Sequence, residues 1–182
     1  MKTISIVVLI LIIILACGYF FSGNDKNNNP SIYFSYSSEI TGFKMSYPAI
    51  YEIKREYIEE GLNRKRDIVL IEKSAIPPPN TPTEGPPSIT ISVFEDSKDI
   101  ELKNWISESK YSNFELGPQV LNEKMVASTT AYEYFWSGLY EGKSVVVKAN
   151  DKIYMFSVTW LTPEDRIIKD FEKLLTSVTF IK

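Results

Sequence analysis

Apolar and polar residues alternate with a period of two along most of the chain after residue 31, a pattern typical of β-strands that have one buried face. In the segment 152–160, Tyr154, Phe156, Val158 and Trp160 share one face, and Ile153 and Met155 share the other. Residues 149–151 before it predict a tight hairpin turn. By the same reasoning we expect strands over 32–36, 42–47, 67–71, 88–94, 125–127, 131–137, 144–148 and 152–160.

Two other segments have apolar residues at helical spacing. The first covers residues 101–109 and presents Leu102, Trp105 and Ile106. The second follows Thr162, which we expect to cap a helix whose first residue is Pro163. Its apolar stripe consists of Ile167, Ile168, Phe171, Leu174, Leu175 and Val178. A short strand over 179–181 is expected to follow, and strands with helices between and after them predict an α+β fold, an antiparallel sheet with helices packed on it.

The first part of the chain has a different pattern. Residues 4–21 are almost continuously apolar and residues 22–30 are polar. About eighteen helical residues span roughly 27 Å, close to the thickness of a bilayer core. We therefore expect an N-terminal transmembrane anchor over 1–22, a polar linker over 23–31 and one globular domain over 32–182. Lys2 and the amino terminus predict that the short N-terminal end stays inside and the domain lies outside the cytoplasm.

The chemical fate of this segment has alternatives. Residues 14–17 resemble a bacterial lipobox, which makes Cys17 a candidate lipidation site. However, Leu15 stands where a small residue is usual, and the apolar run continues through Phe21. Aromatic residues at this end suit the interface end of a spanning helix. A spanning anchor is therefore favoured, while a lipoprotein signal and a cleaved secretory signal stay open.

Composition excludes several classes of function. The 182 residues include no histidine, and the only cysteine is Cys17. Histidine-dependent catalytic triads, thiolate nucleophiles and the usual zinc ligands are therefore absent from the domain. The net charge of −3 disfavours nucleic acid, which requires a basic surface. We expect no catalytic residues, no cofactor and no metal.

Three segments are nevertheless candidates for binding. An aromatic surface for a sugar or a protein partner, or else part of the core, is formed by Tyr132, Tyr134, Trp136 and Tyr140. The acidic residues Glu95, Asp96 and Asp99 either hold a hard cation such as calcium or form a solvated loop that caps a helix. Residues 76–87 contain six of the ten prolines and predict a stiff exposed loop between two strands.

Residues 42–48, with the sequence Gly-Phe-Lys-Met-Ser-Tyr-Pro, resemble the opening of PsbP-like domains. Tyr51 stands where that family usually has tryptophan. The order of the later elements is also similar, so that the resemblance covers residues 33–182. It implies an α/β/α sandwich and a docking or assembly role, best known from the extrinsic subunit of photosystem II. The calcium and chloride role of the photosynthetic members is not carried over, because its positions have no match here.

The sequence thus predicts a non-enzymatic, membrane-tethered binding or assembly module outside the cytoplasm of a bacterial-type cell, which contacts the membrane through residues 4–21. Its partner is expected in an envelope protein complex. One alternative is an envelope enzyme that uses carboxylates alone, which needs two acids about 5–9.5 Å apart in one cleft. Another is a lipoprotein that serves as a structural spacer.

Overall fold

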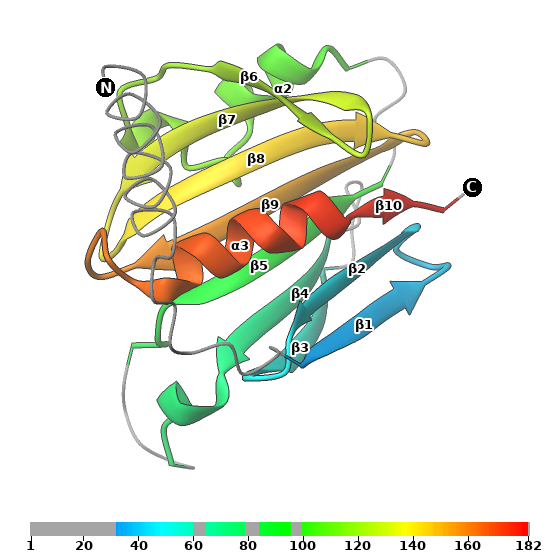
Figure 1. Cartoon of the computed structure of the whole chain (residues 1–182). Helices are drawn as coiled ribbons and strands as arrows, with labels where there is room; N and C mark the ends of the chain where they lie inside the picture. Colours follow the sequence, from blue (N-terminus) through cyan, green and yellow to red (C-terminus); the bar gives the residue numbers. More distant parts are fainter. Residues whose placement is uncertain (1–31, 60–64, 79–83, 96–99, 182) are drawn as a thin grey trace, which may run out of the picture. The chain divides into compact units, whose positions relative to one another are not determined.

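A seven-stranded antiparallel sheet forms the centre of the domain (Figure 1). The structure, a computed structural model, describes residues 32–59, 65–78, 84–95 and 100–181. The strand order is β3-β4-β5-β9-β8-β7-β6. The bounds are β3 (Tyr51–Glu59), β4 (Lys65–Glu72), β5 (Ser88–Phe94), β6 (Asn122–Val126), β7 (Thr129–Ser137), β8 (Glu141–Ala149) and β9 (Lys152–Trp160).

One face of this sheet is covered by the helix α3 (Arg166–Ser177) and by a small second sheet. The second sheet has the order β1-β2-β10, with β1 (Tyr33–Ser38), β2 (Phe43–Pro48) and β10 (Thr179–Phe180). In Figure 1, α3 crosses the sheet over β9, and β1 and β2 lie beside it. Between these layers lies the main core, in which Phe43 on β2 meets Tyr154 and Phe156 on β9 edge to face.

The opposite face carries shorter elements, namely the helix α2 (Leu102–Glu108) and a 3₁₀ turn, η2 (Phe114–Leu116). Glu101 caps α2, because its carboxylate accepts hydrogen bonds from the backbone N–H groups of Lys103 and Asn104. Together these elements enclose a second core, formed by Phe94, Ile106, Phe114, Tyr134, Val146, Ile153 and Met155. A further 3₁₀ turn, η1 (Lys73–Ala75), follows β4.

The alternation in β9 distributes its side chains as predicted. Tyr154, Phe156, Val158 and Trp160 belong to the main core, whereas Ile153 and Met155 belong to the second core. The predicted hairpin turn is also confirmed: Asn150 and Asp151 both have positive φ, of 49° and 60°. Two consecutive left-handed residues are the geometry of a type I′ turn, whose twist matches that of the two strands it joins.

The stripe predicted for the last helix is buried in α3, where Ile167, Phe171, Leu174 and Leu175 face the sheet. At about 1.5–3 kcal/mol per fully buried large side chain, this contact contributes several kcal/mol to folding. The predicted start of the helix was wrong, because α3 begins at Arg166 with Asp165 as its N-cap. The Asp165 carboxylate accepts hydrogen bonds from the backbone of Leu161 and Thr162, which holds the preceding residues in a turn.

The α+β class and the antiparallel sheet are confirmed, and helical elements lie on both faces. Two features were not predicted, the strand β3 and the separation of β1, β2 and β10 into a sheet of their own. The expected anchor over 1–22, the linker over 23–31 and Cys17 lie outside the described residues. Among the helices that the structure describes, none is long and apolar enough to cross a membrane.

Candidate functional site

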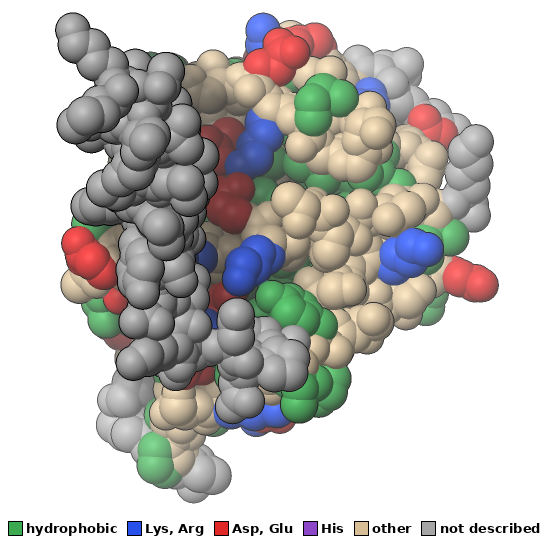
Figure 2. Space-filling view, in the orientation of Figure 1, with side chains coloured by type: hydrophobic (Ala, Val, Ile, Leu, Met, Phe, Trp, Pro, Cys, Tyr) green, Lys and Arg blue, Asp and Glu red, His purple; other side chains and the backbone are tan. Residues whose placement is uncertain are grey.

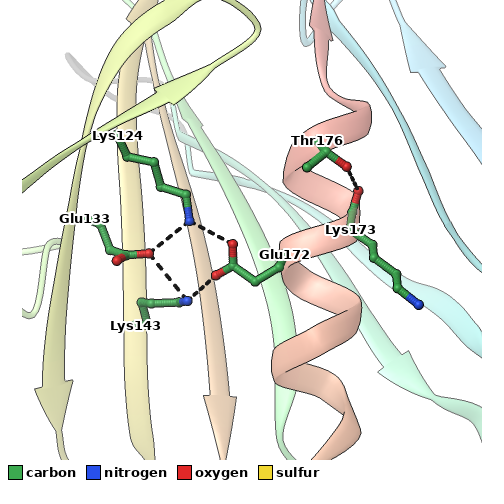
Figure 3. Close-up of polar contacts among 6 residues, drawn as sticks. All are labelled: Lys124, Glu133, Lys143, Glu172, Lys173 and Thr176. Atoms are coloured by element: carbon green, nitrogen blue, oxygen red, sulfur yellow. Dashed lines mark hydrogen bonds and ion pairs between the residues drawn. The ribbon is translucent and has the colours of Figure 1, made fainter. Parts of the chain in front are cut away.

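Four charged side chains meet between the sheet and α3 (Figure 3). They are Lys124 on β6, Glu133 on β7, Lys143 on β8 and Glu172 on α3. The Lys124 ammonium lies 3.1 Å from Oε2 of Glu133 and 2.7 Å from Oε2 of Glu172. Lys143 lies 3.4 Å from Oε2 of Glu133 and donates a hydrogen bond to Oε1 of Glu172. We call this set the ion-pair cluster.

The sheet register brings these side chains together. Lys143 lies opposite Phe135 on β7 and opposite Val158 on β9. Its side chain therefore projects from the face of the sheet that the main core covers. Its Nζ atom lies 5.8 Å from the ring centre of Phe135 and 5.5 Å from that of Phe171 on α3. Both aromatic faces favour a cation at these distances. Lys143 is 6% exposed, and its buried ammonium is paired with the carboxylates of Glu133 and Glu172.

The cluster also shifts the pKa values of two of its members, Glu172 and Lys124. Although burial raises the pKa of Glu172, hydrogen bonds from Lys124 and Lys143 outweigh it and hold that pKa below its usual value. Burial lowers the pKa of Lys124, but hydrogen bonds to Glu172 and Glu133 outweigh this effect and raise it. Both shifts favour the ionised form, so the negative charge of Glu172 and the positive charge of Lys124 stabilise each other.

This charge balance bears on the carboxylate-only enzyme. Glu133 and Glu172 both contact Lys124, so the fold does bring two acids close together. A glycosidase-type acid must stay protonated near neutral pH, which requires a raised pKa. The two lysines have the opposite effect on Glu172. Figure 2 shows basic and acidic side chains side by side in a recess of this face. The cluster is therefore suited to fastening α3 to the far strands of the sheet.

The predicted aromatic surface is divided by the fold. Tyr134 is fully buried in the second core, where its hydroxyl donates a hydrogen bond of 2.7 Å to the carbonyl of Ser112. Burial raises the pKa of Tyr134 well above its usual value. Tyr132 is half-buried, and the Lys103 ammonium lies 5.0 Å from its ring centre. Neither ring presents an open face as the sequence pattern suggested, because α2 and η2 pack on this side of β7.

Trp136 and Tyr140 lie nearer the surface, at the turn that joins β7 to β8. The Trp136 ring lies directly on Gly142, where a Cβ atom would come within 2.4 Å of ring carbons Cε2 and Cζ2. Its Nε1–H donates a hydrogen bond to the Ser144 hydroxyl. The Tyr140 hydroxyl donates a hydrogen bond of 2.8 Å to the Gly85 carbonyl, which ties the proline-rich connection between β4 and β5 to this turn. Partner binding through Trp136 and Tyr140 stays a prediction.

The acidic segment is only partly described. Glu95 forms a 3.7 Å ion pair with Arg66 Nε, while Asp96 and Asp99 lie outside the described residues. Within the described ranges, no three histidine, cysteine, aspartate or glutamate side chains are grouped so that they could hold a metal ion. Cation binding by this segment stays a prediction.

A hollow of about 450 Å³ lies near the end of the described chain and is lined by Glu39, Gly42, Asn150, Lys152, Tyr154 and Ile181. Three of its polar side chains form hydrogen bonds within the protein. Lys152 Nζ donates to the carbonyl of Ile40, Asn150 Nδ2 to that of Ile181, and the Tyr154 hydroxyl to that of Gly42. These bonds close the β1–β2 turn and the end of the chain onto the β8–β9 hairpin.

The sequence interpretation missed the ion-pair cluster, although one signal for it was present. Lys143 shares the face of Val145 and Val147, two fully buried residues of β8. A lysine in register with core positions must find a counter-charge, because a buried unpaired charge is costly. The pattern does not identify that counter-charge, since Glu172 is 29 residues away in the sequence.

No protein-family model and no curated protein matches the sequence. Solved structures do match the fold. The solution structure of cyanobacterial PsbP (CyanoP) from Synechocystis sp. PCC 6803 aligns with a TM-score of 0.55 at 12% identity, over 87% of this chain and 98% of that one. A crystal structure from Bacteroides thetaiotaomicron VPI-5482 aligns with a TM-score of 0.50 at 13% identity, over 81% of this chain but only 48% of that one. The described domain therefore has a PsbP-like fold.

Proposed function

We propose that this chain is a non-enzymatic binding or assembly module, held on the outer side of a bacterial-type membrane by residues 4–21. The PsbP-like fold supports this proposal, because the family resemblance of residues 33–182 implies docking or assembly rather than catalysis. The apolar run at the start of the sequence supports the tether.

The observation that carries the non-enzymatic role is the ion-pair cluster. In this cluster Glu133 and Glu172 each contact both Lys124 and Lys143, so each acid is paired with two lysines. The sequence contains no histidine to replace them as an acid or base. This cluster thus serves to hold α3 against the sheet.

For the contact with a partner we propose the turn around Trp136 and Tyr140, together with the neighbouring Gly85. Both rings are half-buried, so each has a packed side and an accessible side. Aromatic side chains of this kind supply large contact areas with little loss of conformational entropy, and they are enriched in protein interfaces. The partner is expected to be a protein of the envelope.

Crosslinking in intact membranes, followed by affinity purification of the full chain, tests this proposal. We expect one protein to be recovered in stable amounts, and its recovery to fall in the Tyr140→Ala variant. The matched control is Leu116→Ala, which removes an exposed apolar side chain from η2. Turnover of a substrate by a chain that recovers no partner would refute the proposal. A spacer would lose complex assembly on domain deletion, yet tolerate Tyr140→Ala.

The tether is tested separately by the mass of the mature N-terminus. A spanning anchor retains Met1 or Lys2 as the first residue. A diacylglyceryl group on Cys17 as the first residue would show a lipid anchor instead. A first residue beyond position 22 would show a cleaved signal and would remove the tether from the proposal.

A further inference from the structure

The described chain begins at one end of the sheets. Ile32 is 70% exposed, and its carbonyl accepts a hydrogen bond from the N–H of Ala49, just after β2. The first pair of the β1–β2 ladder joins Tyr33 to Pro48. β3 begins at Tyr51, opposite Glu72 at the end of β4. The start of β1 therefore lies at the same end as the start of β3 and the end of β4.

Other loops reach this end as well. β5 starts there, because Ser88 pairs with Ile71 near the end of β4, and Ile89 pairs with Val158 near the end of β9. Glu141 at the start of β8 pairs with both Trp160 and Ser137. The β7–β8 turn and the residues after β9 thus belong to the same end. We call it the Ile32 end, defined by Ile32, the turn 138–140 and residue Leu161.

Two of the tips at the Ile32 end are apolar, whereas the connection between β4 and β5 at the same end carries the exposed charges of Lys73 and Glu84. Leu139 at the tip of the β7–β8 turn is 65% exposed, and Leu161 after β9 is 67% exposed. Tyr33 and Phe34 at the start of β1 are also exposed, and Tyr140 lies beside Leu139. Tight turns usually contain Gly, Asn, Asp or Ser, and a protruding leucine has no role in forming them. Two leucines and several aromatic rings at one end therefore require another explanation.

The opposite end also has exposed apolar side chains, Ile40, Ile100 and Met125, but its turns follow the usual pattern more closely. Asn150 and Asp151 form the β8–β9 turn there, and Ala127 and Ser128 form the β6–β7 turn. Ile40 in the β1–β2 turn is exposed, but the Lys152 ammonium is bonded to its carbonyl and lies next to it. Exposed leucines at turn tips thus occur at the Ile32 end, where the chain continues toward its apolar N-terminal segment.

The length of that continuation limits the distance to a membrane. Nine linker residues, 23–31, reach at most about 30 Å when extended and about 15–18 Å as a flexible coil. A surface at such a distance is presented at a high effective concentration, so weak apolar contacts suffice to hold it. Aliphatic tips flanked by tyrosine and phenylalanine also match the interface region of a bilayer.

We propose that the Ile32 end is a lipid-contacting surface that lies on the outer leaflet, with Leu139 and Leu161 inserted at the level of the headgroups. This inference rests on the tether proposed above and adds the orientation of the domain. The surface suits uncharged lipid, because exposed carboxylates of Glu141 and Glu164 lie beside the two leucines and disfavour an anionic surface. Leu139 occupies the tip of the β7–β8 turn, and the side of the turn that carries Trp136 and the Gly85 contact lies beside the lipid surface, where it is left to the partner protein proposed above.

The test uses the full chain in phosphatidylcholine vesicles, with Cys17→Ala as the background. A single cysteine carrying an environment-sensitive fluorophore is placed by Leu139→Cys or Leu161→Cys, with Glu39→Cys as the control at the opposite end. We expect blue-shifted emission and quenching by headgroup spin labels at positions 139 and 161, at least several-fold stronger than at position 39. Phosphatidylglycerol is expected to leave this quenching unchanged or to weaken it.

Flotation of the same samples separates the two proposals. A chain that floats with the vesicles while both leucine positions stay in water would overturn the lipid-contacting surface and leave the tether intact. Stronger quenching at position 39 would show that the opposite end faces the lipid. A chain that does not float would overturn the tether and the orientation together. Because the vesicles contain no other protein, burial of the two positions reports lipid contact alone.

Discussion

The hydroxyl of Tyr51, at the start of β3, donates a hydrogen bond of 3.0 Å to Oδ2 of Asp170 in the middle of α3. The same carboxylate oxygen lies 3.0 Å from Nε of Arg166, one turn earlier in the helix. Tyr51 and Asp170 are both buried, and burial together with the nearby Asp170 charge raises the pKa of Tyr51 above its usual value. This bond connects the helix to an outer strand of the sheet. It also gives the tyrosine a role that depends on its hydroxyl and that a phenylalanine could not fill.

Tyr51→Phe should therefore destabilise the domain although it preserves the ring. The change leaves a buried carboxylate oxygen without one of its two partners, which costs about 1–3 kcal/mol. The free energy of unfolding in urea measures the effect. Tyr33→Phe is the matched control, because Tyr33 is exposed and should change stability by less than about 0.5 kcal/mol. Equal stability of the two variants would argue against the bond.

Removal of a lysine from the ion-pair cluster should have a similar effect. Lys143→Ala takes away a buried ammonium that Glu133 and Glu172 share, and we expect a loss of about 1–3 kcal/mol in unfolding free energy. Lys173→Ala is the control, because Lys173 lies next to Glu172 on α3 and its side chain points away from the cluster (Figure 3). A Lys143 variant as stable as the Lys173 variant would show that the cluster does not hold the layers together.

The same cluster predicts how stability depends on pH. The pKa of Glu172 is lower in the folded chain, so its contribution is present above the unfolded value of 4.5 and is lost as pH falls through the folded value. Unfolding curves of the wild type and Glu172→Gln should therefore differ near pH 7 and converge in acid. A difference that stays constant down to pH 2 would contradict this assignment.

Lys124 predicts how stability depends on pH in the alkaline range. Its pKa is raised on folding, so its contribution is complete below the unfolded value of 10.5 and declines as pH rises through the folded value. The difference in unfolding free energy between wild type and Lys124→Met should be level from about pH 6 to 9 and shrink only in stronger alkali. A decline that begins near neutral pH would require another titrating group.

The contact between Trp136 and Gly142 can be tested with two glycines of the same turn region. Gly142→Ala places a methyl group within 2.4 Å of the indole, so the ring must move, at a cost of about 1–3 kcal/mol. Gly138→Ala meets no heavy atom within 4 Å and should be nearly neutral. Tryptophan fluorescence and thermal unfolding record both effects. An unchanged spectrum in the Gly142 variant would place the ring elsewhere.

The parts of the fold that the sequence predicted are those with a strong local pattern. β5 and β9 are found within the predicted bounds, because apolar residues alternate along both. β3 was missed because its sequence, YEIKREYIE, is rich in charge, as is permitted on a strand that pairs on one side only. The start of α3 was misplaced because the Asp165 carboxylate bonds backward to Leu161 and Thr162.

The candidate site was harder to predict for a different reason. The alternation in β7 placed Tyr132, Tyr134 and Trp136 on one face, but it did not reveal that α2 and η2 would cover Tyr134. Likewise, the position of Lys143 in its strand indicated a buried charge. Its contact with Glu172, however, depends on how α3 lies across the sheet. Such contacts are set by tertiary packing, which a periodic pattern in one strand does not encode.

The small sheet has a consequence for the order in which the chain folds. β2 pairs on one side with β1, the first described strand, and on the other with β10, which contains Thr179 and Phe180. Sequence-distant pairing of this kind is slow to form. β10 follows β2 by more than 130 residues in the sequence. During synthesis the ring of Phe43 therefore cannot be fully enclosed until β10 has been made. The small sheet is therefore completed only after every strand of the seven-stranded sheet has been synthesised.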